Sequence, residues 1–104
     1  MLTSEATVDT DRAGRYLEQL CRHAAAMGTG GHRHGGPAVA AERSADRGVL
    51  TLEPWGRCVL HAGAAALTLR VEAADADGLR AIQDIVTRDL ERFGRRDGVA
   101  VRWS

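Results

Sequence analysis

Residues 65–104 read AALTLRVEAADADGLRAIQDIVTRDLERFGRRDGVAVRWS, and this stretch decides the fold of the 104-residue chain. Alternating apolar residues from Leu67 to Val71 predict a strand, and Val99–Trp103 predicts another. Between them, apolar residues recur every three or four positions, which predicts an amphipathic helix from about Asp75 to Phe93. The residues of this apolar stripe are Leu79, Ile82, Val86, Leu90 and Phe93. We expect the rest of the chain to pack on this strand–helix–strand unit.

The predicted helix carries its own start and stop signals. The Asp75 carboxylate can accept from the free N–H groups of the first turn, and Asp77 adds negative charge at the positive end of the helix dipole. Gly94 predicts the stop, as a residue in the left-handed conformation. We therefore expect a helix with well-defined ends.

The first part of the chain also reads as a strand followed by a helix. Glu5–Val8 is a short strand, and Asp9-Thr10-Asp11 supplies the N-cap of the helix that follows. This helix is expected to end near Met27, and a flexible loop rich in glycine and histidine then spans residues 28–37. Its apolar stripe consists of Ala13, Tyr16, Leu17, Leu20, Cys21 and Ala24.

Three more strands are predicted in the middle of the chain. Ala38–Glu42 is a weak candidate, while Val49–Glu53 and Arg57–His61 form a hairpin through Pro54-Trp55-Gly56. The element order is then β-α-β-β-β-β-α-β. It predicts a single α+β domain over residues 1–104, with two layers: an antiparallel sheet of five or six strands and two helices on one face.

The composition excludes several classes of protein. Fourteen basic residues, all arginine, balance fourteen acidic ones, so no global basic field attracts nucleic acid or a membrane. No apolar run approaches ~18 residues, the length that spans a bilayer, and residues 1–8 lack the apolar region of a signal peptide. Two cysteines without a secretory signal indicate reduced thiols in the cytoplasm. Motifs of nucleotide sites and hydrolases, such as G-x-G-x-x-G after a strand, G-x-S-x-G or H-E-x-x-H, are missing from the sequence.

Several motifs in order along the chain resemble a family of small bacterial domains of unknown function, common in high-GC bacteria. They are Thr10–Ala13, Arg15–His23, Leu69–Asp75, Leu90–Arg96 and Val101–Trp103. Some members of this family are associated with siderophore-interacting flavin reductases, as neighbours or fusions. The resemblance implies an α+β domain and an iron-acquisition setting, and it implies no catalytic residues. The sequence departs from the family at Asp89, where members tend to carry histidine.

The histidines suggest a metal site. His32 and His34 are two residues apart, so in an extended backbone they share a side and can reach one metal ion. His23, one turn before the loop, and His61 are the remaining histidines. Two ligands do not close a site and a glycine-rich loop does not preorganise them, so we favour a mobile, solvated loop. The sequence predicts no cofactor.

The two cysteines, Cys21 and Cys58, are interpreted as small buried hydrophobic residues. His23 is two positions from Cys21 on a helix, where side chains point apart, so it does not activate the thiol. The two thiols can meet between helix and sheet, but a disulfide is not expected in the cytoplasm.

Arginines gather towards the C-terminus, where an anion or a phosphate-bearing cofactor could dock. They are Arg88, Arg92, Arg95, Arg96 and Arg102. Acidic residues interleave with them, namely Asp84, Asp89, Glu91 and Asp97. The sequence therefore favours a surface that neutralises its own charge.

Two candidate contacts with a partner remain. Trp55, at the tip of the predicted hairpin, is either a partner contact or a side chain that folds back over the sheet edge. Two helices cover only one sheet face, so the other face is open and Val59 can contact a partner there. We expect this face to hold Val49, Thr51, Val59, His61, Thr68, Arg70 and Arg102. A homodimer through this face is the prediction.

Three functions follow from these observations. The first is a non-catalytic cytoplasmic accessory or ligand-binding domain, linked through the resemblance to siderophore-iron handling and a siderophore-interacting reductase. The second is a small enzyme or redox partner with its site in the cleft between helices and sheet. The third is a self-associating module that uses the open sheet face.

Overall fold

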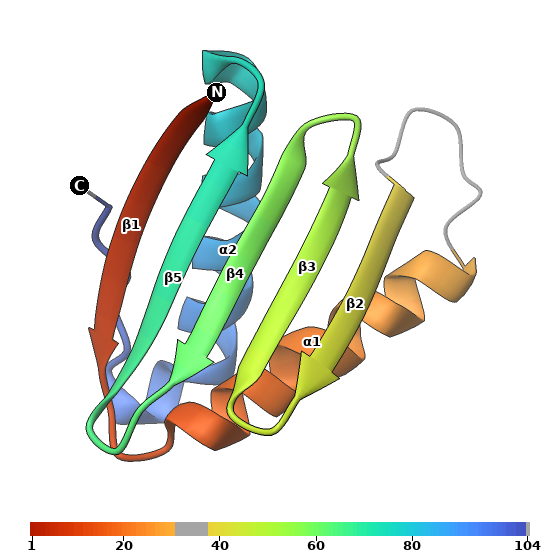
Figure 1. The fold of residues 1–104 in the computed structure, drawn as a ribbon. Coiled ribbons are helices and arrows are strands. Elements are labelled where there is room, and N and C mark those ends of the chain that lie inside the picture. The colour runs from red at the N-terminus through yellow and green to blue at the C-terminus, as the bar shows by residue number, and fades with distance from the viewer. Residues whose placement is uncertain (31–37, 104) are drawn as a thin grey trace.

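The structure is a computed structural model that describes residues 1–30 and 38–103. A five-stranded antiparallel sheet has the strand order β1-β5-β4-β3-β2, and two helices pack on it (Figure 1). The elements are β1 Leu2–Asp9, α1 Ala13–Gly30, β2 Ala38–Ser44, β3 Arg47–Glu53, β4 Gly56–Ala62, β5 Ala66–Ala73, α2 Ala76–Phe93 and the 3-10 turn η1 Arg95–Asp97.

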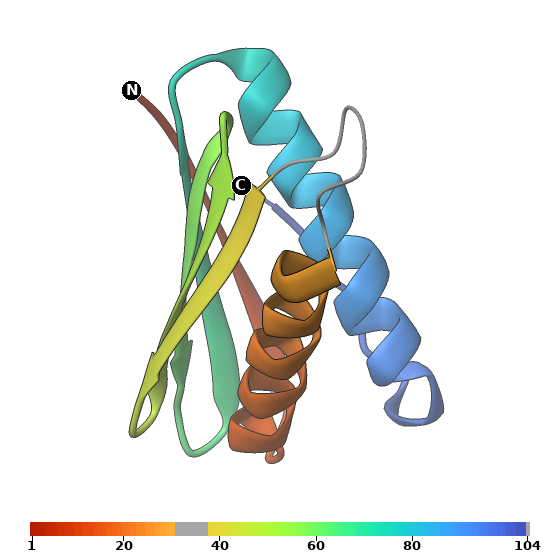
Figure 2. The ribbon, with the colours of Figure 1, turned by 90° about the vertical axis from the view of Figure 1, so that its right-hand side faces the viewer.

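Both helices lie on the same face of the sheet, so the molecule has two layers (Figure 2). α1 crosses β2, β3, β4 and β5, and α2 packs on β5, β4 and β1. The predicted two-layer α+β architecture is confirmed.

The strands alternate between a buried and an exposed side. On β4, Cys58 and Leu60 are completely buried beneath the helices, while Val59 is half-buried and His61 exposed on the other face. Burying a leucine side chain stabilises the fold by roughly 1.5–3 kcal/mol, so this alternation fixes which face the helices cover.

The ends of α2 bring one confirmation and one correction. Asp75 Oδ1 accepts a hydrogen bond of 2.7 Å from the Gly78 N–H, as the N-cap prediction requires. α2 stops at Gly94 as predicted, but Gly94 has a φ of −98°, so its predicted left-handed conformation is wrong. The chain continues into η1, and Gly98, with a φ of 70°, is the left-handed residue. This extra turn carries Arg95 and Arg96 beyond the end of α2.

The predicted sixth strand, Val99–Trp103, is also wrong. It contributes one isolated bridge, between Ala6 and Trp103. α2 holds this segment instead, because the Val101 N–H donates to Glu91 Oε2 (3.2 Å) and Trp103 Nε1 donates to Thr87 Oγ1 (2.8 Å). Arg102 is therefore outside the sheet and does not contribute to its open face.

The first helix is longer than predicted. α1 ends at Gly30 rather than near Met27, and it takes in the first residues of the predicted loop. Residues 31–37 of that loop lie outside the described residues. None of the helices in the described part of the chain is long and apolar enough to cross a membrane.

Candidate functional site

Arginines from distant parts of the sequence meet at one end of the helical layer. The start of α1 and the end of α2 lie at the same end of the molecule in both ribbon views (Figures 1 and 2). Together with η1 they form a hollow of about 390 Å³, called here the arginine hollow. It is lined by Arg12, Arg15, Tyr16, Gln19, Arg92, Phe93, Arg95, Arg96 and Asp97.

The charge of the arginine hollow is strongly unbalanced. Asp97 is the one carboxylate in the lining, against five guanidinium groups. Its Oδ2 lies 3.6 Å from Arg12 Nη1. Within residues 1–30 and 38–103, the other four arginines of the lining form no ion pair. A site of this kind attracts phosphate and carboxylate groups, which guanidinium binds with charge-assisted hydrogen bonds.

Of the acidic residues that interleave with the C-terminal arginines in the sequence, only Asp97 lies in the lining of the arginine hollow. Asp89 is 4% exposed and contacts His23 and Arg88, and Glu91 accepts from the Val101 N–H. Asp84 is exposed eight residues before Arg92, about 12 Å away along the helix. Arg88 is therefore paired, but the arginine hollow keeps an excess of positive charge, contrary to the interpretation that the sequence favours.

Two polar groups complete the arginine hollow. The Tyr16 hydroxyl donates a hydrogen bond to Asp97 Oδ2. Burial raises the pKa of Tyr16, and its hydrogen bond to Asp97 raises it further, so the phenol keeps its proton. Gln19 Oε1 is buried and has no hydrogen-bond partner among the described residues.

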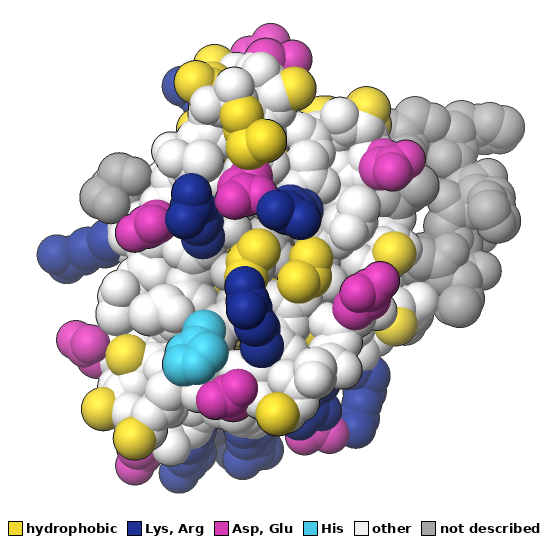
Figure 3. Space-filling view, viewed as in Figure 1, with side chains coloured by type: hydrophobic (Ala, Val, Ile, Leu, Met, Phe, Trp, Pro, Cys, Tyr) yellow, Lys and Arg dark blue, Asp and Glu magenta, His cyan; other side chains and the backbone are white. Residues whose placement is uncertain are grey.

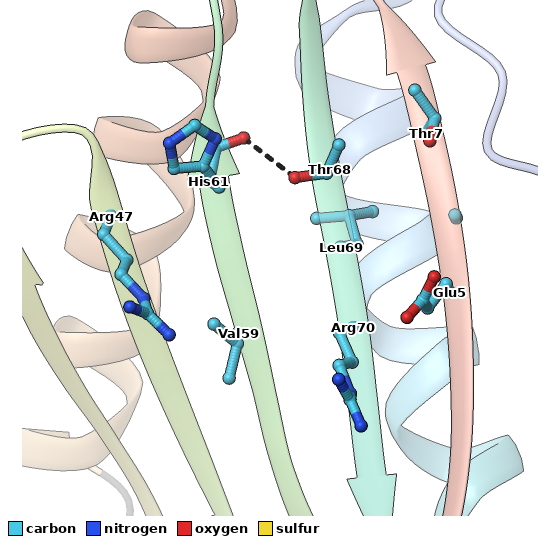
Figure 4. Close-up of a pocket in the computed structure, with 9 residues that line it drawn as sticks. Glu5, Thr7, Arg47, Val59, His61, Thr68, Leu69 and Arg70 are labelled. Carbon is cyan, nitrogen blue, oxygen red and sulfur yellow. Dashed lines mark hydrogen bonds between the residues drawn. The ribbon is translucent and has the colours of Figure 1, made fainter.

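A second hollow lies on the open face of the sheet. Figure 3 shows this face, where apolar side chains at the centre are surrounded by arginine, carboxylate and histidine side chains. The hollow has a volume of about 350 Å³. Its lining includes Glu5, Thr7, Arg47, Val59, His61, Thr68 and Arg70, with Arg47, His61 and Arg70 around Val59 in Figure 4.

Most charges on the open face have partners there. Arg57 Nε lies 2.6 Å from Glu72 Oε1, and Arg70 Nε lies 3.4 Å from the other oxygen of Glu72. His61 Nε2 lies 3.4 Å from Asp46 Oδ2. The register places Arg57 opposite Glu72, and Arg70 lies two residues before Glu72 on the same strand, so these three side chains share a face. This face is consequently less attractive to a free anion than the arginine hollow.

The predicted metal ligands are placed only in part. His32 and His34 lie outside the described residues, so their metal site stays a prediction. His23 Nε2 lies 3.7 Å from the buried Asp89 Oδ2, and the His23 ring meets Phe93 edge to face. In the described part of the chain, no three His, Cys, Asp or Glu side chains gather as metal ligands would.

The space between helices and sheet is small. A cavity of about 20 Å³, lined by Leu20, Leu50 and Val86 among others, opens beside His23 and Asp89. A water molecule occupies roughly 30 Å³ in the liquid, so this cavity is no larger than a water site.

Both cysteines are buried and free. Burial raises the pKa of Cys58 to about 12, and burial also raises the pKa of Cys21. Neither thiol forms an appreciable amount of thiolate at neutral pH, which fits their interpretation as hydrophobic residues.

Trp55 lies in the turn between β3 and β4. Its N–H donates to Leu52 O (2.8 Å), its carbonyl accepts from the Ala74 N–H (3.4 Å), and its partly buried side chain packs against the core. Val59 lies on the open face, as expected. Contact of either residue with a partner stays a prediction.

Comparisons with known proteins give one matching family and a similar solved structure. Residues 5–104 match a family described as "Uncharacterized protein conserved in bacteria (DUF2218)". The NMR structure of PA4090 from Pseudomonas aeruginosa is similar, with 25% sequence identity and a TM-score of 0.73 over 100% of this chain and 96% of that one. No curated protein matches the chain.

Proposed function

We propose that this chain, which belongs to the DUF2218 family of uncharacterized bacterial proteins, is a non-catalytic domain that binds an anionic ligand in the arginine hollow. One observation carries the proposal: four of the five arginines in the lining form no ion pair within the described residues. Unpaired guanidinium groups crowded at one site repel each other, and a bound anion relieves that repulsion.

The size of the arginine hollow supports a small-molecule ligand. Its volume of about 390 Å³ falls within the range of roughly 300–1,000 Å³ that is typical of ligand sites. Phe93 adds an apolar wall beside the charges. The ligand we propose therefore combines an anionic group with an apolar or aromatic part.

An accessory role in siderophore-iron handling is the biological setting that we propose. It is supported by the family resemblance and by the charge of the site, since an iron chelate built from carboxylate or catecholate groups is anionic. A siderophore-interacting reductase would then be the partner. Two free, buried thiols support a cytoplasmic location. The cavity of about 20 Å³ between helices and sheet does not admit a ligand, which supports the arginine hollow as the site instead.

The proposal can be tested by titrating the protein with pyrophosphate and with ferric citrate while recording backbone and arginine side-chain NMR signals. We expect saturable shifts at Arg92, Arg95 and Arg96 with at least one of the two probes. Arg92→Gln should weaken binding about tenfold, the value of one charge-assisted hydrogen bond. Arg80→Gln is the matched control, an exposed arginine near the other end of α2.

Absence of saturable shifts with both probes would overturn the proposed function. Equal losses of affinity in Arg92→Gln and Arg80→Gln would mean that the anion binds without a defined site.

Self-association through the open sheet face is a second candidate function, supported by the register of the sheet. Glu42, Val49, Val59 and Arg70 lie opposite one another on β2, β3, β4 and β5, in one row across the face. A two-fold axis parallel to the strands and between β3 and β4 would bring Val49 of one copy onto Val59 of the other. The same axis would bring Glu42 onto Arg70, so the row is complementary to itself.

Light scattering over a dilution series tests this second candidate. Arg70→Glu and Glu42→Arg should each dissociate the dimer, and the double variant should restore it, because the reversed charges pair again. Val59→Glu should dissociate it without unfolding the chain, since Val59 is half-buried. A parent protein that is monomeric at every concentration would refute self-association.

A further inference from the structure

Asp97 is the carboxylate in the lining of the arginine hollow. It accepts the Tyr16 hydroxyl and lies 3.6 Å from Arg12 Nη1, so a donor on α1 and a cation just before α1 hold a carboxylate that comes from η1. Tyr16 and Asp97 are 81 residues apart in the sequence. Only the packing of α1 against the end of α2 brings them together.

We infer that Asp97 is an internal stand-in for the ligand, and that the ligand displaces it from Tyr16 and Arg12 with a group carrying two negative charges. This inference rests on the proposed function, since it concerns the same hollow. It specifies the class of ligand: a phosphate monoester, a pyrophosphate or a chelate with paired carboxylates, which share a dense double negative charge.

The competition favours a doubly charged ligand for an electrostatic reason. The side chains of Arg12 and Asp97 are 56% and 36% exposed, and ion pairs this exposed are weak in water. A single carboxylate from solution would only exchange one such pair for another. A group with two charges interacts with Arg12 and, at the same time, with arginines such as Arg95 and Arg96 that Asp97 leaves unpaired.

The test compares Asp97→Asn with the parent in calorimetric titrations with pyrophosphate and with acetate. Asn keeps the shape of the side chain and removes its charge. We expect pyrophosphate to bind Asp97→Asn about five- to tenfold more tightly, and acetate to bind this variant while the parent does not bind it. Asp84→Asn is the matched control, since Asp84 is an exposed carboxylate on α2 outside the hollow, and its affinities should equal those of the parent.

The same displacement can be read in the parent, should Asp97→Asn fail to fold. The carboxyl carbon signal of Asp97 should move in step with pyrophosphate saturation, while that of Asp84 stays fixed.

The outcomes separate the inference from the proposed function. The inference is wrong if pyrophosphate binds the parent but binds Asp97→Asn no more tightly. It is also wrong if the Asp97 signal does not move. In either case Asp97 only stabilises the contact between η1 and the start of the first helix. If neither protein binds pyrophosphate or ferric citrate, the proposed function fails together with the inference.

Discussion

Two hollows of similar size in the described part of the chain are lined by arginines, and the surfaces around them differ in how their charges are paired. On the open sheet face, Arg57 and Arg70 both contact Glu72, because the ladder places these residues side by side. In the arginine hollow, helix packing is set by apolar stripes on the buried side, and no comparable rule matches the charges at the helix ends. The register of a sheet therefore tends to place opposite charges next to each other, whereas the site where two helix ends meet can keep an excess of one charge.

The largest expected effect is a loss of stability when a buried side chain of α2 is shortened. Leu90 is completely buried on α2, so Leu90→Ala should lower the free energy of unfolding by about 2–5 kcal/mol through the cavity it leaves. Val49→Ala, at a half-buried position on the open face, should cost less than about 1.5 kcal/mol. Urea unfolding of both variants measures the difference. Equal losses would mean that the open face is covered in the protein.

The next largest effect should be on anion affinity, which substitutions in the arginine hollow should lower far more than substitutions on the open face. Arg95→Gln with Arg96→Gln should weaken pyrophosphate binding about 100-fold, as expected for two lost charge-assisted hydrogen bonds. Arg57→Gln with Arg70→Gln removes the same charge from the open face and should change affinity less than about twofold, since both arginines already contact Glu72. Calorimetry on the two double variants measures this. A larger loss in the open-face variant would reverse the assignment of the site.

Single arginine substitutions should affect stability in the opposite order, with a larger loss on the open face than in the arginine hollow. Arg57→Gln breaks a contact of 2.6 Å with Glu72 and should cost up to about 1 kcal/mol, a value kept small because the Arg57 side chain is 56% exposed. Arg95→Gln removes a charge from a crowded positive site and should cost nothing or stabilise by up to about 0.5 kcal/mol. Thermal unfolding at low salt gives both values. A clear loss in Arg95→Gln would reveal a pairing that the hollow is proposed to lack.

The smallest expected effect is on the pH dependence of stability, and it comes from Tyr16 in the arginine hollow. The folded pKa of Tyr16 is raised above its ordinary value of 10.0 by burial and by Asp97. The stability that this protonated phenol contributes is therefore fully present below pH 10 and is lost as the pH rises through the folded pKa. Tyr16→Phe should show a shallower fall in stability above pH 10 than the parent. The buried thiols titrate in both proteins, so identical slopes would contradict the raised pKa of Tyr16.

The sequence by itself determined the elements and the layer they form. Alternation placed Leu60 and Leu69 beneath the helices, the three-and-four spacing defined the buried stripe of α2, and Asp75 marked its start. These signals are local, since each depends on neighbours within one turn of helix or a few residues of strand. The same signals also predicted which residues lie on the open face, apart from Arg102.

Only the tertiary structure decided the limits of the sheet and the arginine hollow. Val99–Trp103 has the pattern of a strand, but hydrogen bonds from Val101 and Trp103 to α2 hold it away from the sheet. Asp89 becomes buried and contacts His23 and Arg88, so its charge does not reach the arginine hollow. Arg12 reaches Asp97 through the angle at which two helices cross one sheet. That angle depends on packing between residues distant in sequence, and no local pattern specifies it.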